Sequence, residues 1–175
     1  MKIYFAGSIR GGRQDADLYR NIITELQQYG EILTEHVGSK TLTPQGEEEK
    51  TEDYIYRRDI EWLTSADIVV AEVTQPSLGV GYELAFAEKK NIRVVCLFRT
   101  TSENHLSAMI RGNKYFEVFD YEDLVSARNI LKGIFLNQEE QEWNSPNHNP
   151  LWQTKQIVIK TPNKNQYKNS QQLHP

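Results

Sequence analysis

Short apolar runs alternate with segments of helical spacing over the first 138 residues of the chain. The apolar runs are typical of buried strands and predict five of them, at Lys2–Ala6, Glu31–Thr34, Ile68–Glu72, Arg93–Phe98 and Phe116–Phe119. The helical spacing predicts four helices, at Asp15–Tyr29, Asp53–Ser65, Val80–Lys90 and Tyr121–Leu136. Strands that alternate with helices build parallel sheets, so the pattern predicts one α/β domain with a five-stranded parallel sheet and helices on both faces.

The last part of the chain, residues 139–175, differs in composition. It is rich in Asn, Gln, Lys and Pro and holds one apolar patch, Ile157–Ile159. Such a segment buries too little apolar surface to offset the entropy lost on ordering. We therefore predict a folded domain over residues 1–138 and a mostly disordered tail over residues 139–175, with an edge strand at Gln156–Lys160 as the alternative.

Charge and cysteine content narrow the class of protein. The formal net charge is −4, whereas a broad nucleic-acid surface needs a basic balance, so we expect no nucleic-acid partner. The single cysteine, Cys96, lies in a predicted strand and cannot form an internal disulfide, which favours a reducing compartment. No segment is apolar enough to span a membrane, and the first residues lack the apolar stretch of a signal peptide. We expect a cytoplasmic protein, or a nuclear one if its source is eukaryotic.

A glycine-rich loop follows the first predicted strand, and this is the end of a parallel sheet where ligands bind. Its residues, Gly7–Gly12, include Ser8 and Arg10. Glycines let backbone N–H groups approach an anion, and a hydroxyl and a guanidinium suit a phosphate. Arg13-Gln14 stands where a triphosphate-binding loop has Lys-Ser or Lys-Thr, which argues against a triphosphate–magnesium site. A tight strand-to-helix turn without a ligand is the alternative.

Two carboxylates interrupt apolar helix faces. Glu83 falls on the stripe of Val80, Leu84 and Ala87, and Asp59 falls on the stripe of Ile55, Trp62, Leu63 and Ala66. Each of the two carboxylates has a structural alternative. Glu83 could cap helix N–H groups, and Asp59 could form a salt bridge with Arg58 or Arg10. Two helices that each direct one carboxylate inward also supply what glycosidic cleavage needs, a nucleophile and an acid for the leaving group.

Two further side chains accompany these carboxylates. Tyr4 lies on the first predicted strand, where its hydroxyl could orient a neighbouring carboxylate, although a core tyrosine is equally common. His36 ends the second predicted strand and is by itself more typical of a loop histidine than of a catalyst. His, Cys, Asp and Glu nowhere show ligand spacing, so we expect no metal and no cofactor.

Five segments together resemble the 2′-deoxynucleoside 5′-phosphate N-hydrolases, a branch of the nucleoside 2-deoxyribosyltransferase family. They are Ile3–Arg13, Leu33–Val37, Asp59–Leu63, Ala66–Leu84 and Leu106–Gly112. The resemblance covers about Lys2–Leu136 and implies a sheet of flavodoxin-like strand order. The tail after Gln138 has no counterpart in it.

The resemblance assigns roles to residues of this sequence. It implies that Glu83 is the nucleophile, that Asp59 is the general acid, and that Tyr4 positions Glu83. It also implies a homodimer in which Ser107 and Met109 complete the site of the neighbouring subunit. The substrate-binding positions that it implies are Gly7, Ser8, Ile9, Arg10, Gly11, His36, Ser77, Gly79, Ser107 and Met109.

These assignments predict an enzyme that hydrolyses the N-glycosidic bond of 2′-deoxynucleoside 5′-monophosphates, through a covalent glycosyl-enzyme on Glu83. The products would be a free base and 2-deoxyribose 5-phosphate. A nucleoside deoxyribosyltransferase, which passes the sugar to another base, is the alternative within the enzyme class. A nucleotide-binding regulator without catalytic activity is the alternative outside it.

Overall fold

The computed structural model describes residues 1–9, 14–39, 46–47 and 49–143. The chain divides into two compact units, Met1–Phe135 and Leu136–Pro175. The first unit contains the sheet and the helices that pack on it. Most of the second unit, including the predicted edge strand, lies outside the described residues, as do Arg10 and Gly11 of the glycine-rich loop.

Five strands form one sheet in the order β2-β1-β3-β4-β5, and all neighbouring pairs run parallel. Their bounds are Lys2–Ala6 for β1, Glu31–Ile32 for β2, Ile68–Glu72 for β3, Arg93–Arg99 for β4 and Glu117–Tyr121 for β5. The predicted five-stranded parallel sheet of flavodoxin-like order is therefore confirmed. Strand β3 is buried along its whole length because it lies between β1 and β4.

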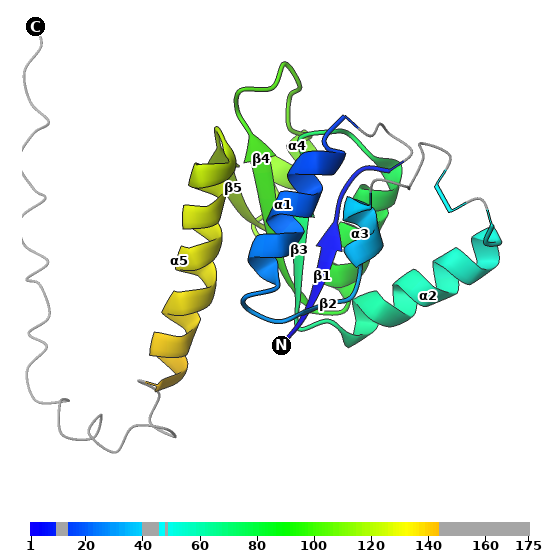
Figure 1. Cartoon of the computed structure of the whole chain (residues 1–175), viewed down its shortest axis with the longest axis horizontal. Helices are drawn as coiled ribbons and strands as arrows, with labels where there is room; N and C mark the ends of the chain where they lie inside the picture. Colours follow the sequence, from blue (N-terminus) through cyan, green and yellow to red (C-terminus); the bar gives the residue numbers. More distant parts are fainter. Residues whose placement is uncertain (10–13, 40–45, 48, 144–175) are drawn as a thin grey trace, which may run out of the picture. The chain divides into compact units, whose positions relative to one another are not determined.

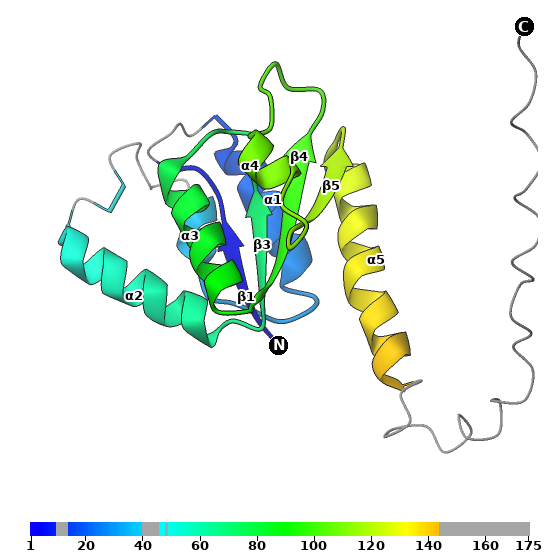
Figure 2. The same ribbon diagram turned by 180° about the vertical axis from the view of Figure 1, so that it is seen from behind.

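Helices cover both faces of this sheet, as predicted. Helix α1 and the part of α5 up to Phe135 pack on one face, and α2, α3 and α4 pack on the other. Figure 1 shows α1 in front of the strands, and the view from behind in Figure 2 shows α3 and α4. The bounds are Ala16–Leu26 for α1, Glu52–Ser65 for α2, Leu78–Lys89 for α3, Ala108–Arg111 for α4 and Leu124–Trp143 for α5.

The alternation of side chains along β1 divides the core between these two faces. Ile3 and Phe5 belong to the cluster on the α1 side, whereas Tyr4 and Ala6 belong to the cluster on the α3 side. Successive residues of a strand point to opposite faces, so this register alone directs the Tyr4 side chain toward α2 and α3.

Helix boundaries differ from the predicted ones where a polar cap starts the helix. Helix α3 begins at Leu78 because the Ser77 side chain accepts a hydrogen bond from the backbone N–H of Val80 at 3.4 Å. Helix α5 begins only at Leu124, after Asp123, whose carboxylate accepts from the N–H of Ser126 at 2.8 Å. An N-cap satisfies an N–H group that the helix leaves unpaired.

Two short helices were not predicted. Glu35–Gly38 forms a single 3₁₀ turn, η1, and residues 108–111 form α4. His36 therefore lies in η1 and not at the end of a strand, because β2 already ends at Ile32. Within the described residues, no helix combines the length and the apolar character that crossing a bilayer requires.

Candidate active site

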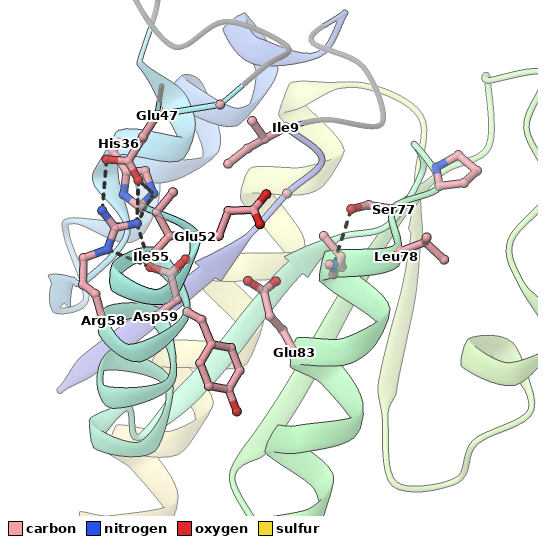
Figure 3. Close-up of a pocket in the computed structure, with 16 residues that line it drawn as sticks. Ile9, His36, Glu47, Glu52, Ile55, Arg58, Asp59, Ser77, Leu78 and Glu83 are labelled. Carbon is pink, nitrogen blue, oxygen red and sulfur yellow. Dashed lines mark hydrogen bonds and ion pairs between the residues drawn. The ribbon is translucent and has the colours of Figure 1, made fainter. Parts of the chain in front are cut away.

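A pocket of about 660 Å³ opens beside the carboxyl end of β1. Its walls come from the segment after β1, from η1 and residues 46–47, from α2, and from the start of α3 (Figure 3). The lining residues are Gly7, Ile9, His36, Gly46, Glu47, Glu52, Ile55, Tyr56, Arg58, Asp59, Pro76, Ser77, Leu78, Gly79, Val80 and Glu83. Seven of the predicted site residues thus line one cavity, although they come from segments far apart in the chain.

Glu83 enters this pocket from α3 and is held by Tyr4. The Tyr4 hydroxyl, on a side chain that is 2% exposed, donates a hydrogen bond of 2.8 Å to Glu83 Oε1. Val80, Leu84 and Ala87 are buried on the same helix face, so Glu83 is the carboxylate within an apolar stripe, as the spacing predicted. Because α3 begins at Leu78 and not at the predicted Val80, Glu83 lies in the second turn, where the helix dipole favours its charge only weakly.

Burial sets the protonation of Glu83. It raises the pKa of the Glu83 carboxyl to about 7, the hydrogen bond from Tyr4 acts in the opposite direction, and the charge of Asp59 adds to the increase. A carboxylate taken out of water binds its proton more tightly because its charged form is poorly solvated. Perturbed carboxyl groups of this kind cluster in functional sites.

Asp59 faces the same pocket from α2 and forms the salt bridge with Arg58 that the sequence left open. Arg58 Nε donates to Asp59 Oδ1 at 2.8 Å. A second carboxylate, Glu47, accepts from Arg58 Nη1 at 3.0 Å and lies 2.6 Å from Nη2. Burial raises the pKa of Asp59 above its usual range, and the Arg58 guanidinium acts against that increase.

His36 borders the pocket beside this ionic cluster. Its Nε2 lies 3.4 Å from Arg58 Nη2, and its ring is 5.8 Å from the ring of Trp62. Burial lowers the pKa of His36, and the neighbouring guanidinium lowers it further. The imidazole is therefore neutral near pH 7 and accepts a hydrogen bond more readily than it balances a negative charge.

The segment after β1 and the start of α3 form the part of the pocket that suits an anion. Gly7 and Ile9 line it, and Ser8 between them is buried, with a hydroxyl that has no hydrogen-bond partner among the described residues. Ser77 and Gly79 line it at the N-terminus of α3. The first N–H groups of a helix lack partners within that helix, and this makes such a terminus an anion site.

The structure does not bring Ser107 and Met109 to this pocket within one chain. Both are exposed, Met109 to 82%, and both line a second cavity of about 510 Å³ between α3 and α4. The two cavities share Pro76, Ser77, Leu78 and Val80 in their walls. The second cavity therefore lies directly beside the first.

Sequence reasoning missed Glu47 as a pocket residue and treated Arg58 only as a structural partner. Glu47 lies in a polar segment without periodicity, so its type and position carried no signal. Arg58 precedes Asp59 directly, and that adjacency is the only sequence signal for the pair.

Cys96 is buried, and burial raises the pKa of its thiol to about 12, as suits a core residue.

Two carboxylates from different helices thus face one cavity, each with its own polar partner. Glu83 is held by a hydroxyl and Asp59 by a guanidinium. This arrangement can supply a nucleophile on one side of a bound sugar and a proton donor on the other. The described residues contain no group of three or more His, Cys, Asp or Glu side chains placed to hold a metal ion.

Comparison with known proteins finds relatives over most of the chain. A 5-hydroxymethyl-dUMP N-hydrolase of Danio rerio is 53% identical over 138 residues, which cover 77% of this chain and 96% of that protein. The protein of the same description from Homo sapiens is 54% identical, over 69% of this chain and 72% of that one. A putative 2′-deoxynucleoside 5′-phosphate N-hydrolase 1 of Nematostella vectensis is 58% identical, over 70% of this chain and 86% of that protein.

A solved structure and a family model complete the comparison. The structure of a CMP N-glycosidase of Clostridium botulinum covers 75% of this chain and 98% of its own, with a TM-score of 0.54 and 14% identity. A likeness at that identity supports the fold alone. The model that describes nucleoside 2-deoxyribosyltransferase matches residues 3–145. With this match and relatives above 50% identity, the chain belongs to the nucleoside 2-deoxyribosyltransferase family, as the sequence motifs predicted.

Proposed function

We propose that this protein hydrolyses the N-glycosidic bond of 2′-deoxynucleoside 5′-monophosphates and releases a free base and 2-deoxyribose 5-phosphate. The observation that carries the proposal is the pairing of Glu83 with the Tyr4 hydroxyl, in a pocket that Asp59 also faces. Relatives above 50% identity are described as 5-hydroxymethyl-dUMP N-hydrolases. We therefore propose 5-hydroxymethyl-dUMP as the first substrate to test.

In the first step, an oxygen of ionised Glu83 attacks C1′ of the deoxyribose. The C1′–N bond breaks, its electron pair stays with the base, and Asp59 donates a proton to the departing base. The sugar is then esterified to Glu83, and Asp59 is ionised. The Tyr4 hydroxyl keeps one oxygen of Glu83 in place through its 2.8 Å hydrogen bond, which leaves the other oxygen for the attack.

In the second step, water completes the hydrolysis. Ionised Asp59 takes a proton from a water molecule, and the resulting hydroxide oxygen bonds to C1′ as the bond to Glu83 breaks. Both carboxyl groups return to their starting protonation states, so the cycle balances without a cofactor. This exchange of acid and base roles is the logic of a retaining glycosidase.

The anionic end of the substrate is assigned to the glycine-rich loop and the start of α3. Ser77 and Gly79 present the helix N-terminus to the pocket, and the buried Ser8 hydroxyl lacks a partner among the described residues. A buried hydroxyl without a partner costs free energy, so a phosphate oxygen bound nearby would relieve that cost. The contribution proposed for Arg10 and Gly11 lies outside the described residues.

The proposed active unit is a homodimer in which Ser107 and Met109 reach the neighbouring site. Their exposure, and their absence from the pocket of their own chain, support this role. A two-fold contact would use the α4 surface twice and would complete both pockets at once.

The decisive experiment is product analysis by chromatography. The protein is incubated with 5-hydroxymethyl-dUMP, with dUMP or with deoxyuridine, each with and without a second free base. Free base and 2-deoxyribose 5-phosphate alone support the proposal. Transfer of the sugar to the second base would establish the transferase alternative, and the absence of any product from all substrates would favour a regulator.

Glu83→Ala tests the covalent step separately. We expect a loss of at least ~10³-fold in kcat because the variant lacks the nucleophile. Mass spectrometry of the acid-quenched wild-type reaction should find a sugar phosphate on the peptide that contains Glu83. A Glu83→Ala enzyme with near wild-type activity would refute the assignment.

A further inference from the structure

Arg58 contacts two carboxylates at once, those of Asp59 and Glu47, and this arrangement affects whether Asp59 is protonated. The Arg58 side chain is 9% exposed and lies between Asp59 and Glu47 (Figure 3). Its Nε and Nη2 both lie 2.8 Å from one oxygen of Asp59, Oδ1, whereas its two Nη atoms contact both oxygens of Glu47, at 2.6 and 3.0 Å. The two-oxygen contact is the stronger geometry for a guanidinium, so Glu47 is its main partner.

The charges of this trio can be counted directly. Arginine stays protonated in proteins, so Arg58 supplies one positive charge to two carboxyl groups. The hydrogen bond from Arg58 lowers the pKa of Glu47 to about 2, whereas burial raises that of Asp59. Glu47 is therefore the group that stays ionised. With Asp59 protonated, these three groups together are neutral, and with Asp59 ionised they carry a net negative charge in a half-buried place. Lys50 also contacts Glu47, at 2.6 Å, but its side chain is 41% exposed and water screens its charge.

We propose that Glu47 is a positioning residue for the general acid: by engaging Arg58 as its own ionic partner, it leaves Asp59 able to carry the proton that the departing base requires. This inference rests on the proposed function, in which Asp59 is the acid. Without Glu47 the whole charge of Arg58 would act on Asp59. Asp59 would then be held as a carboxylate, which can accept a proton but cannot donate one.

Other charged groups around Asp59 do not replace Glu47. His36 from η1 is neutral, and Lys50 donates to Glu47 Oε1 at 2.6 Å. Glu83 and Tyr4 face Asp59 from α3 and β1, and the charge of Asp59 in turn acts on both of them. Among these described groups, Glu47 is the only one with a negative charge that contacts the guanidinium bound to Asp59; the contact of neutral His36 with it is longer, at 3.4 Å.

The test is the pH dependence of kcat for Glu47→Gln, which removes the charge and keeps the size of the side chain. We expect a ~10-fold loss of kcat on the alkaline limb, where Asp59 has lost its proton, and little loss at acid pH, where Asp59 is protonated in both enzymes. Glu49→Gln is the matched control, since Glu49 is an exposed carboxylate two residues away. Glu47→Asp, which keeps the charge, should restore most of the limb.

Two further measurements distinguish a Glu47 that keeps Asp59 protonated from a Glu47 that only supports the local structure. A 5-fluorouracil deoxynucleotide, whose base departs with less help from a proton, should lose much less activity in Glu47→Gln than dUMP does. In a background of Asp59→Asn, adding Glu47→Gln should cause no further loss, because the acid on which it acts is already absent.

Several results would overturn the inference. If Glu47→Gln lost the same factor in kcat at every pH and for both leaving groups, Glu47 would only support the fold of its segment. A further loss in the Asp59→Asn background would mean that it acts through another group. The proposed function fails by a different result, a wild-type rate for dUMP in Asp59→Asn alone, so the two failures are distinguishable.

Discussion

Replacing Tyr4 by phenylalanine isolates what one hydroxyl does for the proposed nucleophile. The ring stays in the core between β1 and the α2–α3 side of the sheet, and only the 2.8 Å hydrogen bond to Glu83 is lost. Glu83 must be ionised to attack, and that hydrogen bond stabilises its ionised form. Tyr4→Phe should therefore raise the pKa of Glu83 and delay the rise of activity with pH.

The size of the effect follows from the strength of the bond. A hydrogen bond to a charged group contributes about 1.5–3 kcal/mol and one to a neutral group about 1 kcal/mol, so the ionised form loses roughly 0.5–2 kcal/mol more, with a midpoint of about 1.3 kcal/mol. Since 1.36 kcal/mol corresponds to one pKa unit, the value should rise from about 7 to about 8. The ionised fraction at pH 6 then falls about ninefold, whereas at pH 9 it falls by only about a tenth.

The assay is kcat/KM between pH 5 and 9 for wild type and Tyr4→Phe, with the released base measured by chromatography. Titration of the substrate phosphate cancels in the ratio of the two enzymes. Tyr121→Phe is the matched control, because its buried hydroxyl also donates to a buried carboxyl, Glu72, at 2.9 Å on the opposite face of the sheet. If the ratio of kcat/KM for Tyr4→Phe to that for wild type does not change with pH, the reasoning is refuted. Tyr4 would then orient Glu83 without changing its pKa.

Three further predictions follow from the same contacts. Glu83→Gln should raise the thermal midpoint relative to wild type at pH 8 but not at pH 4, because a folded-state pKa of about 7 above the ordinary 4.5 means that wild type loses stability as pH rises between those values; equal midpoint differences at both pH values would contradict it. The monophosphate should be strongly preferred over the nucleoside, and Ser77→Ala should weaken that preference through KM for the monophosphate, whereas comparable kcat/KM for both substrates in wild type would favour the transferase. Light scattering should find a dimer, and Ser107→Ala should weaken monophosphate binding; a fully active monomer would exclude the shared site.

The sequence by itself determined the fold and the approximate faces of its helices. Apolar runs and helical spacing are local signals, because strand and helix geometry repeat every two and 3.6 residues. These signals predicted the sheet of five parallel strands and placed Glu83 and Asp59 on apolar stripes. They located helix starts less well, since capping by Ser77 and Asp123 depends on one side chain and not on a repeat.

Only the tertiary structure decided which side chains of the candidate site contact one another. Tyr4 and Glu83 are 79 residues apart and meet because the register of β1 and the docking of α3 bring them to one face. Glu47, which lies in a segment without periodicity, pairs with Arg58 of α2, and Ser107 lines a neighbouring cavity and not the pocket of its own chain. Such contacts depend on the packing of whole elements, and the protonation of both carboxyls depends in turn on the burial that this packing creates.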